Sequence, residues 1–296
     1  MHRQSFWCTV MVEQPRYTPV ELIRLTAEYF KTKNVDAPRL EAEVLLAHLL
    51  EVDRLRLYLD FDKPLTQDEV AGYRVLVRRR ASGEPTAYIC AKREFWSLEF
   101  EVCPGVLIPR PETEVLVERA LEVMGETGEF LEVGVGSGAI STALMKERGG
   151  WRGAGVEISA EAEIVAARNI AKHGLGGRYE LFSGNLYGPV VGRVFNVIVS
   201  NPPYIPSGEI EGLEREVSEH EPRLALDGGE DGLEIIRRLA EGAAPHLEKG
   251  GHIMVEFGAG QGGAVKRIFE ETNKFDQVEL LRDYSGRDRI LRARQS

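Results

Sequence analysis

The second half of the chain, from about Glu129 onward, alternates between short apolar segments and helical patterns. Neighbouring parallel strands need a long crossover connection, usually a helix, so this alternation is typical of a parallel sheet with helices on both faces. We therefore predict an α/β fold with a seven-stranded, doubly wound (Rossmann-like) sheet. The strands are expected at residues 130–133, 155–158, 179–182, 195–200, 252–257, 278–281 and 289–291.

The first two of these strands end in residues that suit a nucleotide-like ligand. Glycines allow a tight turn and a close backbone approach to a ligand at the start of the next helix. Glu157, at the end of the second strand, can accept hydrogen bonds from ribose hydroxyls. The combination predicts a nucleoside-containing cofactor without separating NAD from S-adenosylmethionine. The glycine turn after the first strand reads Gly134-Val135-Gly136-Ser137-Gly138.

The fourth strand, residues 195–200, runs directly into the tetrapeptide Asn201-Pro202-Pro203-Tyr204. Prolines cannot donate backbone hydrogen bonds, so the strand stops there and Asn201 is held at its carboxyl end, where open α/β sheets bind ligands. The Asn201 amide oxygen and the Pro202 carbonyl can accept the two hydrogens of a planar NH2 group, and Tyr204 offers a flat ring. In isolation, the same residues also fit a loop in which Asn201 caps a turn.

Methyl transfer makes better use of this tetrapeptide than hydride transfer does. A planar amide or exocyclic amine is a weak nucleophile, and its nitrogen becomes positive as it attacks a sulfonium methyl group. Two oxygens that bind its hydrogens orient the lone pair and stabilise that charge. No strong base is needed, because the methylated cationic nitrogen is acidic.

With the glycine turn, Glu157 and SNPPY, the chain resembles the class I S-adenosylmethionine-dependent methyltransferases. Within that group it resembles the release factor glutamine methyltransferases (the PrmC/HemK family) over roughly residues 18–292. The resemblance implies transfer of a methyl group from S-adenosyl-L-methionine to the side-chain amide nitrogen (N5) of the GGQ-motif glutamine of class I peptide chain release factors. Four further stretches carry it: GEPTAYICAKREFWSLEFEV, LIPRPETE, SEHEPRLALDGGEDGL and IMVEFGAGQG.

The resemblance also implies roles for individual residues. The cofactor contacts would be Gly134 to Gly138, Glu157, Asn185, Leu186 and Asn201, and the substrate contacts would be Asn201, Pro202, Pro203 and Tyr204. The chain departs from the family at two of these positions. Glu157 stands where many members have Asp, and Asn185 stands where the family usually shows an acid.

Three other interpretations remain open at this point. A ribosomal-protein glutamine methyltransferase is the nearest, although that group resembles PRSP-type sequences where this chain has PRPETE. An adenine-N6 nucleic-acid methyltransferase also uses NPPY, but it must hold a flipped base and its strand. A helical interaction module on an inactive methyltransferase fold is the third. Arg110 is expected either to cover the cofactor or to form a structural salt bridge, and Glu256 to orient its neighbours rather than act as a base.

The sequence also predicts four segments. Residues 1–17 are expected to be a loose extension, and residues 18–90 a helical domain that recognises the substrate. Residues 91–108 are expected to form a β-hairpin connector, and residues 109–296 the S-adenosylmethionine-dependent methyltransferase domain.

The charge of −10 argues against a wide nucleic-acid-binding face. Residues 1–93 carry 15 basic and 13 acidic side chains, against 22 and 34 in the rest of the chain. The one dense basic run, Arg78-Arg79-Arg80, is expected to be a solvated helix end. The three cysteines and six histidines show no metal-ligand spacing, so no metal site is predicted. With no signal or membrane-spanning pattern, we expect a cytoplasmic protein without a membrane partner.

Overall fold

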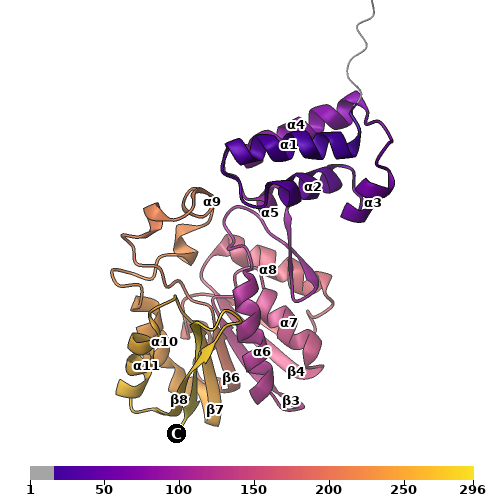
Figure 1. Cartoon of the computed structure of the whole chain (residues 1–296). Coiled ribbons are helices and arrows are strands. Elements are labelled where there is room, and N and C mark those ends of the chain that lie inside the picture. Colours follow the sequence, from indigo (N-terminus) through magenta and orange to yellow (C-terminus); the bar gives the residue numbers. More distant parts are fainter. Residues whose placement is uncertain (1–16) are drawn as a thin grey trace, which may run out of the picture. The chain divides into compact units, whose positions relative to one another are not determined.

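The computed structural model describes residues 17–296, which divide into two compact units, one ending at Cys90 and the other running Ala91–Ser296 (Figure 1). The expected loose extension at residues 1–17 lies, apart from Tyr17, outside the described residues. Each unit is described by itself below. Within residues 17–296, no helix is both long enough and apolar enough to cross a bilayer.

The first unit is helical. Its two longest helices, α1 and α4, both begin with a capping box, in which the N-cap threonine and a glutamate three residues later satisfy each other's backbone N–H groups. At α4, the Thr66 N–H donates to Glu69 Oε2 at 2.7 Å and the Glu69 N–H donates to Thr66 Oγ1 at 3.2 Å. The helices are α1 (Pro19–Thr32), α2 (Pro38–Leu49), α3 (Arg54–Leu59), α4 (Gln67–Ala81) and α5 (Thr86–Ile89).

The core of this unit is formed by side chains that the helical periodicity places on one face of each helix. Phe30, Leu45, Leu46 and Tyr73 are fully buried there. The Tyr73 hydroxyl donates to the Ala42 carbonyl at 2.8 Å, so the only polar atom of that buried ring has a partner.

The three consecutive arginines at the end of α4 have three different environments. Arg79 pairs with Glu84, and the buried Arg80 pairs with Glu41 at 2.8 Å. Arg78 is exposed and has no side-chain partner within residues 17–296. Two of the three arginines therefore stabilise the helical unit itself, and only Arg78 is left exposed to contact another molecule.

The second unit contains a seven-stranded sheet with the order β5-β4-β3-β6-β7-β9-β8, which confirms the predicted fold class. The strands β3 to β7 are parallel to one another. A separate two-stranded hairpin precedes them, formed by β1 (Lys92–Phe95) and β2 (Leu98–Glu101). The sheet strands are β3 (Thr127–Val133), β4 (Gly150–Glu157), β5 (Tyr179–Ser183), β6 (Phe195–Ser200), β7 (Leu247–Glu256), β8 (Phe275–Arg282) and β9 (Asp288–Gln295).

The sheet is not parallel throughout, which corrects the sequence-based expectation. Strand β9 lies between β7 and β8 and is antiparallel to both. The reason is the connection between β8 and β9, a tight turn around Asp283 and Gly286 that is too short for a parallel crossover.

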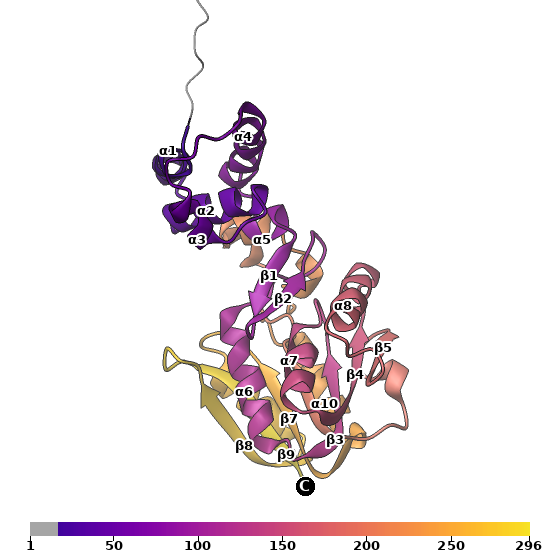
Figure 2. The same ribbon diagram turned by 90° about the vertical axis from the view of Figure 1, so that its right-hand side faces the viewer.

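Helices cover both faces of the sheet (Figures 1 and 2). Side chains of α6, α7 and α8 pack on one face, and those of α10 and α11 pack on the other. Successive residues of a strand point to opposite faces, so Val197 and Val199 of β6 face the first group and Ile198 faces the second. The helices are α6 (Glu114–Val123), α7 (Ala139–Glu147), α8 (Ala160–Lys172), α9 (Arg215–Ser218), α10 (Glu234–Ala243) and α11 (Gly262–Glu271), with five 3-10 turns at Pro111–Thr113, Gly188–Val190, Ile210–Gly212, Arg223–Ala225 and Ala244–His246.

Candidate functional site

The carboxyl ends of five adjacent parallel strands meet at one edge of the sheet. The Ser200 hydroxyl at the end of β6 donates to the Val133 carbonyl of β3 at 2.7 Å, which ties the NPPY segment to the start of the glycine turn. In sheet order, the residues at or just after the ends of β5, β4, β3, β6 and β7 are Asn185, Glu157, Gly134, Asn201 and Glu256.

A small hollow of about 50 Å³ opens between these strand ends and the segment before α6. It contains Asn201 and most of the glycine turn, which are far apart in the sequence. The structure therefore brings together two of the predicted motifs. Its lining residues are Phe95, Leu107, Pro109, Arg110, Thr113, Glu132, Gly134, Val135, Gly136, Ser137, Ala139, Ile140 and Asn201.

The glycine turn has a backbone that only glycine adopts easily. Gly134, Gly136 and Gly138 have φ of +78°, +57° and +80°. A Cβ atom added to Gly134 or Gly136 would meet no atom of the protein within 4 Å, whereas one added to Gly138 would contact Ala166 at 3.5 Å. The first two glycines thus leave open space above the backbone, which a ligand can occupy in close contact.

The carboxylate of Glu157 holds this turn in place. One oxygen accepts the Gly136 N–H at 2.8 Å, and the other accepts the N–H groups of Ile158 and Ser159 at 2.9 and 2.8 Å. The side chain is buried, and three of its roughly four acceptor positions are used. Glu157 therefore links the ends of β3 and β4 and retains capacity for one more donor.

Glu132 is a site residue that the sequence analysis did not single out. It lies fully buried in β3, two residues before the glycine turn, and lines the hollow. Its Oε2 accepts hydrogen bonds from the backbone N–H and the hydroxyl of Ser141, but its Oε1 is buried with no partner. Burial raises the pKa of Glu132 to about 8 against the effect of the Ser141 hydrogen bonds. An acid between the apolar residues Leu131 and Val133 was the signal that could have revealed it.

The side chain of Asn201 lies beside two buried residues, Thr113 and Glu256. Its Nδ2 donates to the Thr113 hydroxyl oxygen at 3.1 Å. Glu256, at the end of β7, follows the residue paired with Ser200, and burial raises the pKa of its carboxyl to about 7 while the Thr113 side chain lowers it. Both partners are nearly inaccessible, with 4% of Thr113 and 1% of Glu256 exposed.

The rest of the NPPY segment is fixed by contacts with two other loops. The Gln261 side chain donates to the Tyr204 carbonyl at 2.8 Å and accepts the Gly258 N–H, also at 2.8 Å. The next residue, Ile205, forms a parallel bridge with Asp227. Burial raises the pKa of Tyr204 to about 12, so its hydroxyl stays protonated at neutral pH. The segment is thus rigid on both sides of its two prolines.

Arg110 forms a salt bridge, one of the two roles expected for it. Its guanidinium contacts Glu221 at 2.5 Å, and the Glu221 side chain is buried. Burial raises the pKa of Glu221, against the effect of Arg110. The pair connects the segment before α6 with the segment after NPPY, so the two loops that flank the hollow are held together.

Asn185 and Leu186 do not line this hollow. Asn185 is exposed, and Leu186 is half-buried against the core with a φ of +51°. The preceding residue, Gly184, donates its N–H to the Glu157 carbonyl at 2.8 Å, so the pair lies beside the end of β4. A cofactor contact by these residues stays a prediction.

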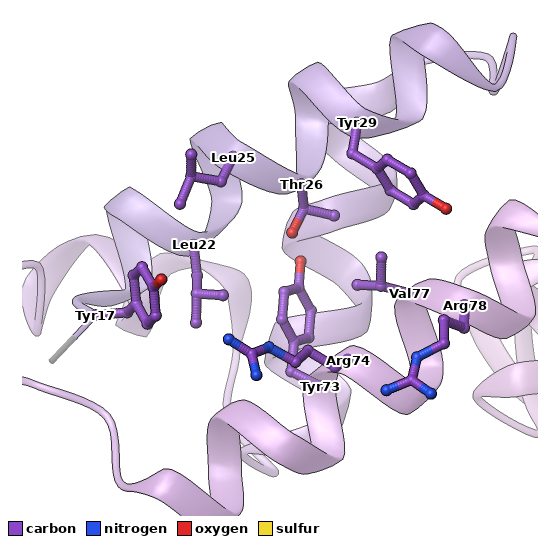
Figure 3. A pocket seen from close by; sticks show the side chains of 9 residues that line it. All are labelled: Tyr17, Leu22, Leu25, Thr26, Tyr29, Tyr73, Arg74, Val77 and Arg78. Atoms are coloured by element: carbon purple, nitrogen blue, oxygen red, sulfur yellow. The ribbon is translucent and has the colours of Figure 1, made fainter. Parts of the chain in front are cut away.

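The helical unit contains a hollow of its own, of about 290 Å³, between α1 and α4 (Figure 3). Its walls are mainly apolar and aromatic. Arg74 and Arg78, one turn apart on α4, lie at its border, and neither has a side-chain partner within residues 17–296. The remaining lining residues are Tyr17, Leu22, Leu25, Thr26, Tyr29, Tyr73 and Val77.

Two known sequence families match the chain. The PrmC N-terminal domain matches residues 21–90, and the methyltransferase small domain matches residues 111–217. The release factor glutamine methyltransferase of Geobacter sulfurreducens is 44% identical over 285 residues, which cover 96% of this chain and 99% of the relative. The protein of the same name from Chlorobaculum tepidum is 38% identical, covering 95% of this chain and 98% of the relative.

Solved structures share the fold of the sheet unit at low sequence identity. A methyltransferase from Pyrococcus furiosus aligns with a TM-score of 0.52 at 19% identity, covering 77% of this chain and 98% of that one. The catalytic domain of hMettl16, solved with an RNA hairpin, aligns with a TM-score of 0.56 at 14% identity, covering 75% of this chain and 80% of that one. At these identities the likeness concerns the fold alone.

Proposed function

Because the chain belongs to the release factor glutamine methyltransferase family, we propose that it transfers a methyl group from S-adenosyl-L-methionine to N5 of the GGQ-motif glutamine of class I peptide chain release factors. The observation that carries this proposal is the near full-length match to relatives of that name. The rigid NPPY corner beside an open glycine turn supports it with a chemically suitable site.

The residues around the hollow suit S-adenosylmethionine. The open backbone at Gly134 and Gly136 allows close approach, and the buried, unpartnered Oε1 of Glu132 requires a donor. The ammonium group of S-adenosylmethionine is such a donor, and its positive charge would keep the carboxylate ionised. We assign the remaining acceptor position of Glu157 to a ribose hydroxyl.

Held by the glycine turn, Glu132 and Glu157, S-adenosylmethionine would supply an electrophilic methyl group to the amide nitrogen of the substrate, and that nitrogen would then lose one proton. The Asn201 amide oxygen and the Pro202 carbonyl would accept the two N–H bonds of the substrate amide and orient its lone pair. Both oxygens lie in a rigid segment, so they would stabilise the developing positive charge without reorganising.

The direct test uses purified protein, labelled S-adenosylmethionine and a class I release factor. We expect one methyl group per factor, located by mass spectrometry on the GGQ glutamine and absent when that glutamine is replaced by alanine. Label found only on a ribosomal protein would favour the related ribosomal methyltransferase. Label that disappears after nuclease treatment would favour a nucleic-acid substrate. Either of the last two results would replace the proposal.

We assign release factor recognition to the helical unit, since the NPPY corner would contact only the tip of one side chain. The hollow between α1 and α4 combines mainly apolar walls with two arginines that have no side-chain partner within residues 17–296 (Figure 3). Such a surface fits an apolar side chain flanked by carboxylates, because arginine at the border of an interface attracts acids and covers apolar atoms. A substrate that works on the ribosome would also place the enzyme in the cytoplasm.

Reversing both border charges, in R74E/R78E, should raise KM for the whole release factor about tenfold, because two favourable charge contacts become repulsive. KM for a short GGQ peptide should stay the same. Arg24→Glu is the matched control, since Arg24 lies exposed on α1 and does not line the hollow. Equal changes for factor and peptide, or an equal change in the control, would remove this surface from recognition.

A further inference from the structure

The side-chain amide of Asn201 has two ends of nearly equal shape and opposite polarity. Its oxygen accepts hydrogen bonds and its NH2 group donates them. A substrate NH2 group can be bound only if the oxygen faces the hollow. The orientation of this amide is therefore a requirement of the proposed reaction, and the protein must supply the free energy that selects it.

Two residues from other parts of the chain lie beside this amide. Thr113 is in the 3-10 turn before α6, and Glu256 is the last residue of β7. The Thr113 hydroxyl oxygen accepts the Asn201 Nδ2–H at 3.1 Å. The pairing of Ser200 with Val255 in β6 and β7 puts Glu256 next to Asn201, and Thr113 lowers the pKa of the buried Glu256 carboxyl. The three side chains thus form one continuous set of contacts at the edge of the hollow.

We propose that Thr113 and Glu256 are positioning residues that fix the Asn201 amide with its oxygen toward the substrate. An ionised carboxylate only accepts, so the single hydroxyl proton of Thr113 is directed to Glu256. The hydroxyl oxygen can then only accept, and among the two ends of the amide only NH2 can face it. The inference rests on the proposed function and extends it to two residues that need not touch the substrate.

When Glu256 is protonated, the donor and acceptor in each of these contacts exchange roles. The acid can then donate to Thr113, the threonine proton turns toward Asn201, and the amide presents NH2 to the hollow. Two NH2 groups facing each other cannot bind, so the substrate amide would lose an acceptor. The carboxyl has a pKa near neutrality because it is buried, and its charged and titratable neighbours are Arg289 and Arg110, which lower the pKa, Glu112, which raises it, and Tyr204.

The proposal is tested first by removing the hydroxyl. Thr113→Val keeps the side-chain shape but leaves the amide orientation unselected, so kcat should fall about tenfold, the worth of roughly one hydrogen bond. Thr113→Ser should restore kcat to within about twofold. The Kd for S-adenosylmethionine should change far less than kcat in both variants. A valine variant with the kcat of the wild type, or a serine variant as slow as the valine variant, would overturn the proposal.

The second test is the pH dependence of kcat at saturating S-adenosylmethionine and release factor. Wild-type kcat should decrease as pH falls through about 7, as Glu256 becomes protonated. Glu256→Gln cannot titrate, so its kcat should be lower at high pH and should lack this pH dependence. If the variant keeps the wild-type pH profile, Glu256 does not control the amide.

A measurement independent of activity separates this inference from the proposed function. In protein labelled with 15N-asparagine, the side-chain NH2 signal of Asn201, identified by its loss in Asn201→Ala, should shift with a midpoint near pH 7 in the wild type and not in Glu256→Gln. A titrating signal in a protein that methylates no release factor would uphold the positioning role and reject the function. A signal that does not titrate, in an enzyme that methylates the release factor, would uphold the proposed function and reject the positioning role.

Discussion

Replacing Asn201 with alanine is expected to lower kcat for release factor methylation by at least about 100-fold, the usual loss when one preorganised polar group is removed from a site where charge develops. The variant loses the acceptor that is proposed to orient the substrate amide. It also leaves the Thr113 hydroxyl without its donor. The Pro202 carbonyl, proposed as the second acceptor, remains, so some activity should persist.

Cofactor binding serves as the control for this variant. Asn201 is one of many residues around the hollow, and the glycine turn and Glu132 are unchanged in the variant. Isothermal titration should therefore give a Kd for S-adenosylmethionine that is weakened far less than kcat. A kcat close to that of the wild type would exclude Asn201 from the mechanism. An equal loss in both quantities would assign it to cofactor binding alone.

Replacing Gly136 with alanine is expected to weaken S-adenosylmethionine binding by about 10- to 100-fold, because a methyl group forced into a close contact typically costs about 1–3 kcal/mol. The added Cβ would meet no protein atom within 4 Å, so it would enter the space proposed for the ligand. The backbone φ of +57° adds a strain of roughly 1–2 kcal/mol to the folded protein.

Gly192 provides a matched control for that strain. It has a φ of +82°, its added Cβ would also meet no atom within 4 Å, and it lies between β5 and β6 outside the hollow. Gly192→Ala should therefore lower Tm about as much as Gly136→Ala while leaving the Kd for S-adenosylmethionine unchanged. If both variants bound the cofactor as the wild type does, the glycine turn would not be part of the cofactor site.

These two predictions concern residues that local sequence rules identify. A strand that ends in two prolines must leave the sheet at Asn201, and a strand that ends in G-x-G-x-G must turn tightly at Gly136. Both motifs follow strands of one parallel sheet, so their position at one edge also follows from topology. Their proximity is therefore a consequence of the sequence pattern, and the structure confirms it through the hydrogen bond between Ser200 and Val133.

The departure from the sequence interpretation has an equally local cause. The direction of β9 depends on a turn of a few residues, which periodicity alone does not distinguish from the end of a crossover.

The sequence by itself determined the doubly wound sheet, the resemblance to release factor glutamine methyltransferases, and the identity of the NPPY and glycine motifs, because each depends on residues that are close together along the chain. Only the tertiary structure decided which side chains surround Asn201. Thr113 and Glu256 lie 88 residues before it and 55 residues after it, and they reach it because the 3-10 turn Pro111–Thr113 and the end of β7 lie beside the end of β6. Hydrogen bonds between such distant side chains require the folded backbone, since no periodicity or spacing encodes which way a hydroxyl or an amide will point.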